Sequence, residues 1–158
     1  MSKSPQLANR FREVIFDGTW IANTNFKMQL SDINWEIATK KIDDFNTIAD
    51  LTQHILYYIK GLNEFFQQGA LTISDKYSFD FPPITCDEDW EQIKSIFFSE
   101  ASIFVNTVGK FSDAELNEIF VKKEYGTFER NIDAMIEHCY YHLGQIVLLR
   151  KMIHQTSL

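Results

Sequence analysis

The chain has 158 residues, 45% of them hydrophobic, with 14 Phe, 6 Tyr and 3 Trp. This length and apolar content suffice to bury the core of one ordinary domain, and we expect a single domain over residues 1–158. The formal net charge is −7. Nucleic acid is therefore not expected as a partner, because a nucleic-acid binder needs a basic face. No run of about 18 apolar residues occurs, so we expect no association with a membrane.

The N-terminal segment and the cysteines bear on where the protein acts. The first residues, Met1–Gln6, lack the apolar core of a secretory signal. The two cysteines, Cys86 and Cys139, do not form the spaced framework of a disulfide-rich protein. Both features predict a cytoplasmic location.

The spacing of apolar residues follows a helical period, and Gly and Pro are few, so we expect an all-α protein. The first helix is predicted at about Gln6–Phe16, before the breaker at Gly18. A short helix is predicted at Ile33–Lys41, with Ser31 or Asp32 as its N-cap.

The two middle helices have the clearest boundary signals. One is predicted from Ile48 to about Gln68, with Asn46 or Thr47 as its N-cap. Residues 70–85 contain two consecutive prolines and are predicted to form a long connection. The next helix is predicted at about Asp87–Val108, with acidic residues in its first turn that suit the positive end of the helix dipole.

The last major helix is predicted from Gly126-Thr127 to about His154, after a mixed segment with a helical turn at residues 113–117. Read with a period of seven, its inward stripe is expected to contain Asn131, Met135, His138, His142, Gln145, Leu149 and Met152. One up-and-down-type four-helix bundle, with a long connection between helices two and three, accounts for these elements.

Two histidines, His138 and His142, lie one helical turn apart on this stripe, where apolar side chains are expected. A buried imidazole without a partner is costly. A metal ion would satisfy both rings, because residues i and i+4 lie one above the other on a helix. His54 borders the apolar face of helix Ile48–Gln68 and can reach the same core. Three nitrogen ligands would leave an open coordination position, as in catalytic zinc sites. The alternative is that buried hydrogen bonds or water satisfy the rings.

Three further side chains are candidates for the surroundings of such a site. Asp50 either orients the ring of His54 or only complements the helix dipole. Gln145 either hydrogen-bonds a metal-bound water or a substrate, or bonds to another helix in the core. Tyr58 is expected to pack in the core, with the pocket as the alternative for its hydroxyl. No nucleophile elbow, phosphate-binding loop or zinc-protease helix is present, and the sequence identifies no catalytic residue.

The segments around the histidines resemble the DinB/YfiT-like family of metalloenzymes. Residues Thr47–Ile55 are similar to the family's second helix, and His138–Ile146 reads H-x-x-x-H-x-G-Q-I, the family's signature in its last helix. Gly18-Thr19-Trp20 and Trp90 are also similar to family members. The resemblance extends from about Leu7 to Met152 and implies a four-helix bundle that binds a metal.

The resemblance implies that His54, His138 and His142 hold a divalent metal ion. Imidazole ligation fits zinc, nickel, copper or iron, of which we expect zinc or nickel. The resemblance also implies a homodimer and activities such as thiol-dependent transfer or isomerisation.

We therefore expect a metal-dependent transferase or hydrolase that acts on a small organic substrate, with a low-molecular-weight thiol as a second cofactor. The alternative is a non-catalytic dimeric helical module with a structural or vestigial metal site.

Overall fold

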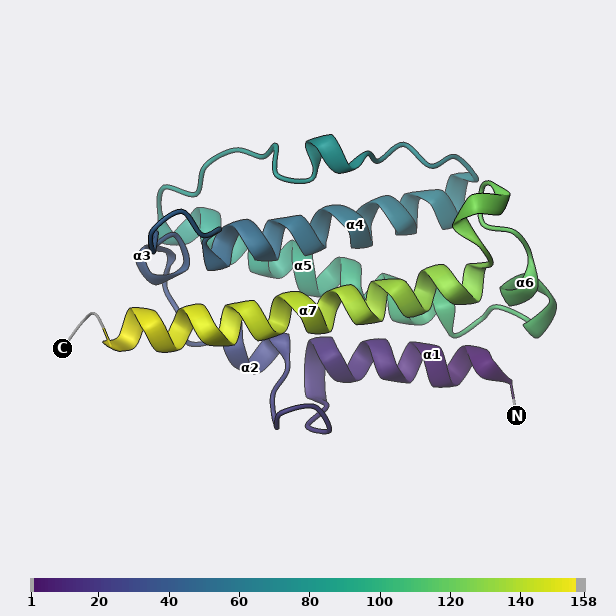
Figure 1. Cartoon of the computed structure of the whole chain (residues 1–158), viewed down its shortest axis with the longest axis horizontal. Helices are drawn as coiled ribbons and strands as arrows, with labels where there is room; N and C mark the ends of the chain where they lie inside the picture. Colours follow the sequence, from purple (N-terminus) through teal and green to yellow (C-terminus); the bar gives the residue numbers. More distant parts are fainter. Residues whose placement is uncertain (1, 156–158) are drawn as a thin grey trace.

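The computed structural model describes residues 2–155, and every extended regular element among them is a helix (Figure 1). The prediction of an all-α protein is confirmed. The helices are α1 (Lys3–Arg12), α2 (Phe26–Leu30), α3 (Trp35–Ala38), α4 (Ile48–Gln68), α5 (Asp87–Val108), α6 (Asp113–Asn117) and α7 (Phe128–Gln155). A π-helical turn follows α1 at Glu13–Asp17, and single 3-10 turns lie at Asp75–Tyr77 and Lys123–Tyr125.

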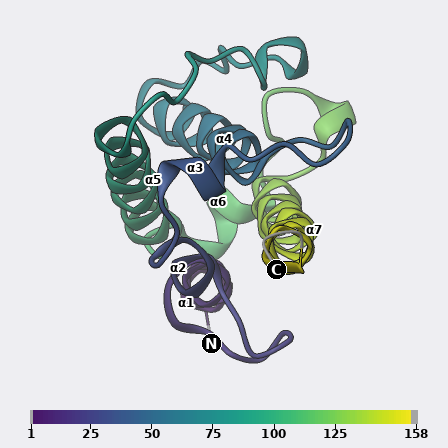
Figure 2. The same ribbon diagram turned by 90° about the vertical axis from the view of Figure 1, so that its left-hand side faces the viewer.

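The four longest helices, α1, α4, α5 and α7, surround a common core (Figure 2). α4 packs against α5 and α7, and α1 packs against the same two helices. Large rings fill the space between them, among them Phe11 from α1 and Trp90, Phe97 and Phe104 from α5, all fully buried. None of the helices within residues 2–155 has both the length and the apolar character needed to cross a membrane.

The helices α4 and α5 run in the same direction, and α1 and α7 run opposite to them (Figure 1). At one end, the backbone amide of Trp35 in α3 donates to the carboxylate of Asp87, the first residue of α5 (3.1 Å). At the other end, the Ser4 hydroxyl near the start of α1 donates to the carbonyl of Val108, the last residue of α5. An up-and-down bundle would alternate directions, so this part of the prediction is wrong. The connection over residues 69–86 runs back along α4 and lets α5 begin at the same end.

The predicted boundaries of α4 and α5 are confirmed. At the start of α4, the Thr47 hydroxyl accepts from the Asp50 amide (3.0 Å), and the Asp50 carboxylate accepts from the Thr47 amide (2.8 Å). This capping box satisfies two amides that the helix itself leaves unpaired. Gly69 follows the last residue of α4, and its φ of +75° lies in the left-handed region that glycine adopts without steric cost.

The predictions for the N-terminal helices need correction. The first helix begins earlier than predicted, at Lys3. The helix predicted at Ile33–Lys41 is the short α3, and its N-cap is Asn34, whose side chain accepts from the amide of Ile37 (3.0 Å). Ser31 is not available as that cap because it ends α2, where its amide bonds to the carbonyl of Lys27.

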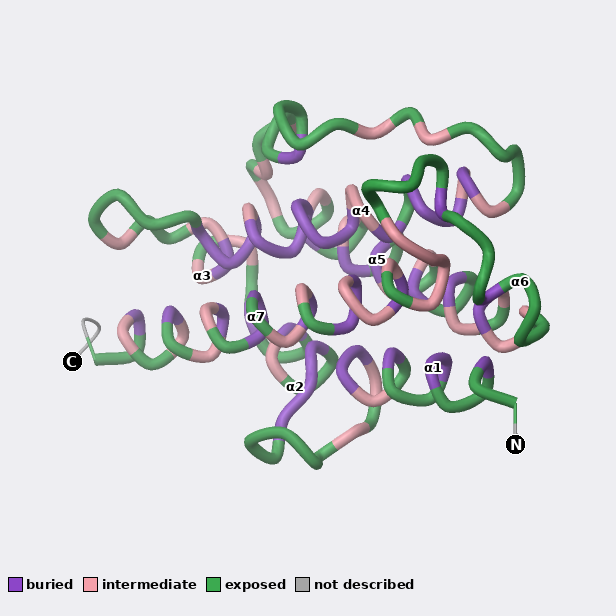
Figure 3. The backbone as a smooth tube through the Cα atoms, turned by 45° about the vertical axis from the view of Figure 1, so that its right-hand side comes forward, coloured by how far each residue is buried: buried purple, intermediate pink, exposed green. Residues whose placement is uncertain are grey.

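The inward face of α7 is rotated relative to the predicted stripe. The residues that α7 buries most completely are Ile132, Ile136, Cys139, Leu143 and Ile146. The predicted stripe lies beside this face, with Met135, His142 and Leu149 buried and Asn131, His138, Gln145 and Met152 half-buried. Figure 3 shows buried, intermediate and exposed residues alternating along α7. The histidine pair thus lies at the edge of the core.

The connection between α4 and α5 is held against α4 by a close approach at Gly61. A β-carbon at this position would overlap the side chain of Ile73. Gly61 therefore lets the connection pack directly on α4. On this helix, Tyr58 lies about one turn before Gly61 and His54 about two turns before it.

Candidate metal centre

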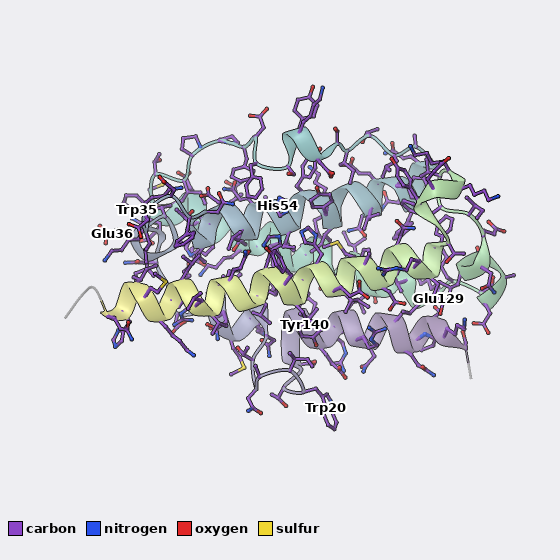
Figure 4. The ribbon with its side chains drawn as sticks, in the orientation of Figure 1. Trp20, Trp35, Glu36, His54, Glu129 and Tyr140 are labelled. Carbon is purple, nitrogen blue, oxygen red and sulfur yellow. The ribbon has the colours of Figure 1, made fainter. Side chains whose placement is uncertain are left out.

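The structure brings three histidines together from two helices. His54 comes from α4, and His138 and His142 come from α7. The Nε2 atom of His138 lies 3.2 Å from that of His54 and 2.8 Å from that of His142. His54 and His142 are buried, and His138 is half-buried. Figure 4 labels His54 on α4.

The other ring nitrogen of two of these histidines is already bound. The Nδ1 atom of His54 lies 3.1 Å from the carbonyl oxygen of Ser78, and the Nδ1 atom of His142 lies 2.6 Å from Oε1 of Gln145. Both oxygens accept, so each Nδ1 carries the proton and donates it. In a neutral imidazole this leaves the Nε2 lone pair free. The Nε2 lone pairs of His54 and His142 thus both point into the cluster that the three histidines form.

This arrangement fits a metal ion. Zn–N bonds of about 2.0–2.1 Å place two nitrogen ligands about 3.3 Å apart in a tetrahedral site and about 2.9 Å apart at a right angle. The distance of 3.2 Å falls in this range, and the distance of 2.8 Å lies just below its lower end. Without a cation, the single Nε2 atom of His138 faces two acceptor nitrogens and can satisfy both only by sharing one proton. The donor set therefore suits a divalent cation.

The pKa values of all three imidazoles lie below the ordinary value, chiefly because burial disfavours the charged form. The effect is largest for His138, whose pKa falls to about 4 through burial and the neighbouring rings of His142 and His54, against the opposing influence of Asp75. All three are consequently neutral near pH 7, which is the form that binds metal.

The metal-free protein is expected to lose stability as the pH falls from about 6.5 towards about 4, the range between the ordinary and folded pKa of His138. In this range the unfolded chain binds protons at its histidines and the folded chain does not, so acid favours unfolding. Urea unfolding at pH 7, 6 and 5 measures the effect. A His138→Asn variant is the control and should show a smaller pH dependence. Equal stability of the wild type at all three pH values would contradict the assignment.

Aromatic rings enclose the cluster on the side of the connection. The ring of Phe79 stacks on that of His54, with 4.2 Å between centroids and 13° between planes. The ring of Tyr58 meets the rings of His54 and His138 edge to face, each at 5.1 Å. These contacts restrict the ring orientations of the two histidines and cover part of their surface.

The Tyr58 hydroxyl donates a hydrogen bond to Oδ1 of Asp75 (2.6 Å). Burial and this bond raise the pKa of Tyr58 to about 12. Tyr58 thus combines both of its predicted roles, because its ring packs in the aromatic group and its side chain lines a cavity beside the histidines.

Asp50 lies in the first turn of α4, as in the second of its two predicted roles. Asp50 does not orient His54, because its carboxylate is used in the capping box with Thr47 and the carbonyl of Ser78 lies at Nδ1 of His54 instead. The side-chain oxygen of Gln145 bonds within α7 and not to another helix, and its bond to a metal-bound water or a substrate stays a prediction. Gln145 lies one turn beyond His142 on α7 and holds that ring.

A cavity of about 570 Å³ opens beside the cluster, between α4, α7, the 70–77 segment and the loop before α7. His138 forms part of its wall, and Asp75 and Tyr58 line it nearby. Most of the remaining lining is apolar, as in Leu62 and Met135. This size and lining are typical of small-molecule sites.

Residues 25–158 match DUF1572, a family described as "Protein of unknown function". The chain belongs to this family. The match includes α4, α5 and α7 with all three histidines, whereas α1 precedes it. A search of curated proteins and a search of solved structures each found no match.

Three residues beside the histidines of this DUF1572 chain were not predicted from its sequence: Asp75, Ser78 and Phe79. All three lie in the connection between α4 and α5. Ser78 acts through its backbone carbonyl, which any residue type carries, so no residue pattern marks it. The aromatic residues at positions 77, 79 and 81 indicate that the connection packs against another segment of the chain, but the sequence does not identify that segment.

Proposed function

We propose that the protein binds one divalent metal ion through His54, His138 and His142 and uses it to act on a small organic substrate. The observation that supports this most directly is the convergence of three Nε2 atoms while Nδ1 of His54 and of His142 is held by an oxygen acceptor. Hydrogen bonds of this kind to the second ring nitrogen are the usual support of metal-binding histidines.

An open coordination position favours a catalytic over a structural ion. Among residues 2–155 the group contains three histidines and no cysteine or carboxylate, whereas structural zinc is usually closed by four protein ligands. Such an ion, zinc or nickel, would lower the pKa of a coordinated water to about 7 or hold a low-molecular-weight thiol as its thiolate. We propose on this basis a hydrolase or a thiol-dependent transferase.

The residues around the cluster support this proposal. His138 forms part of the cavity wall, so a substrate in the cavity would lie next to the ligand set. Phe79 and Tyr58 cover the flanks of His54 and limit access by bulk water. The H-x-x-x-H-x-G-Q-I segment further supports placing this DUF1572 chain with the DinB/YfiT-like four-helix metalloenzymes.

We also propose that the protein forms a homodimer through the outer face of α7. Tyr141 and Leu148 are large side chains with 64% and 58% of their surface exposed. Gly144 lies between them, and a β-carbon there would meet open space. A face of this kind allows close approach of a second helix. Light scattering measures the mass in solution, and Leu148→Glu should convert a dimer to a monomer; a monomeric wild type would refute this proposal.

The proposed function is tested with tag-free protein loaded with zinc, nickel or cobalt. We expect about one equivalent of bound metal by elemental analysis and a rise in melting temperature, since a ligand at a hundredfold excess over its Kd stabilises the folded state by about 2.7 kcal/mol. In the cobalt form, added glutathione or 2-mercaptoethanol should change the visible spectrum. A protein that takes up no metal would refute the site, and a cobalt spectrum unchanged by thiols, water analogues or pH would favour a structural ion.

A further inference from the structure

The cavity beside the histidines has one carboxylate in its lining. Among the described residues that line it, Asp75 is the only Asp, Glu, Lys or Arg. The ammonium group of Lys122 lies 4.4 Å from the ring centroid of Tyr125, and Lys122 is not among the lining residues. The cavity is thus apolar with one carboxylate at its solvent-exposed rim.

The position of this carboxylate is fixed by two neighbouring tyrosines of α4. The Tyr57 hydroxyl accepts from the amide of Ser74 (2.9 Å) and donates to the carbonyl of the same residue (3.0 Å). The Tyr58 hydroxyl donates to Asp75 (2.6 Å). Three hydrogen bonds therefore hold the two-residue segment Ser74-Asp75 against the helix, which directs the carboxylate to the rim of the cavity.

Aromatic rings also line the cavity. Tyr58, Phe120 and Tyr125 contribute rings to the wall. The faces of aromatic rings attract cations, and the position of Lys122 over Tyr125 is an example within this structure. A carboxylate together with aromatic rings favours a ligand that carries positive charge over a neutral or anionic ligand of the same shape.

We infer that this cavity binds a small amphipathic amine, with its apolar body among the apolar wall residues and its ammonium group at Asp75. The ligand would lie against His138 and hence beside the ion. That the amine is the substrate of the metal centre rests on the proposed function, whereas its binding in the cavity does not.

The test uses three probes of nearly equal size on metal-free protein: 4-phenylbutylamine, 4-phenylbutanol and 4-phenylbutyrate. Affinities come from titrations followed by the chemical shifts of backbone amides. We expect the amine to bind about threefold to tenfold more tightly than the alcohol. The carboxylate should bind more weakly than the alcohol. Salt at about 0.5 M should reduce these differences, because the rim is open to solvent.

Two variants and a control assign the preference to the cavity. Asp75→Asn should abolish the preference for the amine while the alcohol binds as before. Ala134→Phe, which fills the cavity from α7, should weaken all three probes. Asp80→Asn removes an exposed carboxylate of the same connection that does not line the cavity, and it should behave like the wild type.

The inference is overturned if amine and alcohol bind equally, if Asp75→Asn keeps the preference, or if none of the probes shifts the amides of the cavity wall. Metal uptake is measured separately. Amine binding without metal uptake would refute the proposed function and leave the amine site standing, and the reverse result would refute the amine site alone.

Discussion

A His142→Ala variant is expected to bind zinc at least about a hundredfold more weakly than the wild type. The variant removes one of the three proposed nitrogen ligands and the Nδ1–Gln145 contact that orients it. Loss of an orienting partner alone typically costs about 10–100-fold in metal affinity, so loss of the ligand itself should cost more. Competition with a chromophoric chelator on tag-free protein measures the affinity.

The matched control for this experiment is His154→Ala. His154 lies on the same helix, is exposed, and is not part of the histidine cluster. Its removal should leave zinc affinity unchanged, and circular dichroism should show the same helix content in both variants. Equal affinities for wild type and His142→Ala, or an equal loss in both variants, would refute the three-histidine site.

A Gln145→Leu variant is expected to bind metal about 10–100-fold more weakly, although Gln145 is not a ligand. Leu keeps the approximate volume but cannot accept the proton on Nδ1 of His142, so the ring loses the contact that directs Nε2 to the cluster. Zinc affinity is measured by the same competition titration.

A second variant at this position separates orientation from packing. In Gln145→Glu the side chain again accepts from Nδ1 of His142, and affinity should return to within about threefold of the wild type or exceed it. If Gln145→Leu matches the wild type, or if the Glu variant is as weak as the Leu variant, Gln145 does not act as an orienting residue.

Local signals explain why the long helices were predictable. Thr47 and Gly69 mark the ends of α4 through capping and a left-handed turn, and both depend only on residues near in sequence. The histidine pair was visible for the same reason, because residues four apart always share a helix face. His54 was placed by its position relative to one apolar stripe on its own helix.

The features that escaped prediction depend on contacts between distant segments. The parallel course of α4 and α5 follows from the path of the connection, which no local pattern encodes. The rotation of the inward face of α7 reflects the simultaneous packing of that helix on α1 and α4. The role of Asp50 could not be decided from the sequence, because a carboxylate in the first turn of a helix can either orient a nearby imidazole or cap the helix. The structure shows that Asp50 caps α4.

For the proposed metal centre, the separation of the three histidines along the chain sets the expected order of folding and metal uptake. His54 and His138 are 84 residues apart, so an extended polypeptide offers no preformed chelate beyond the pair on α7. A large aromatic interior supplies the driving force for compaction without an ion. Maturation should thus proceed from a collapsed apoprotein that later captures its cation, in contrast to zinc fingers, which remain unstructured until the metal arrives.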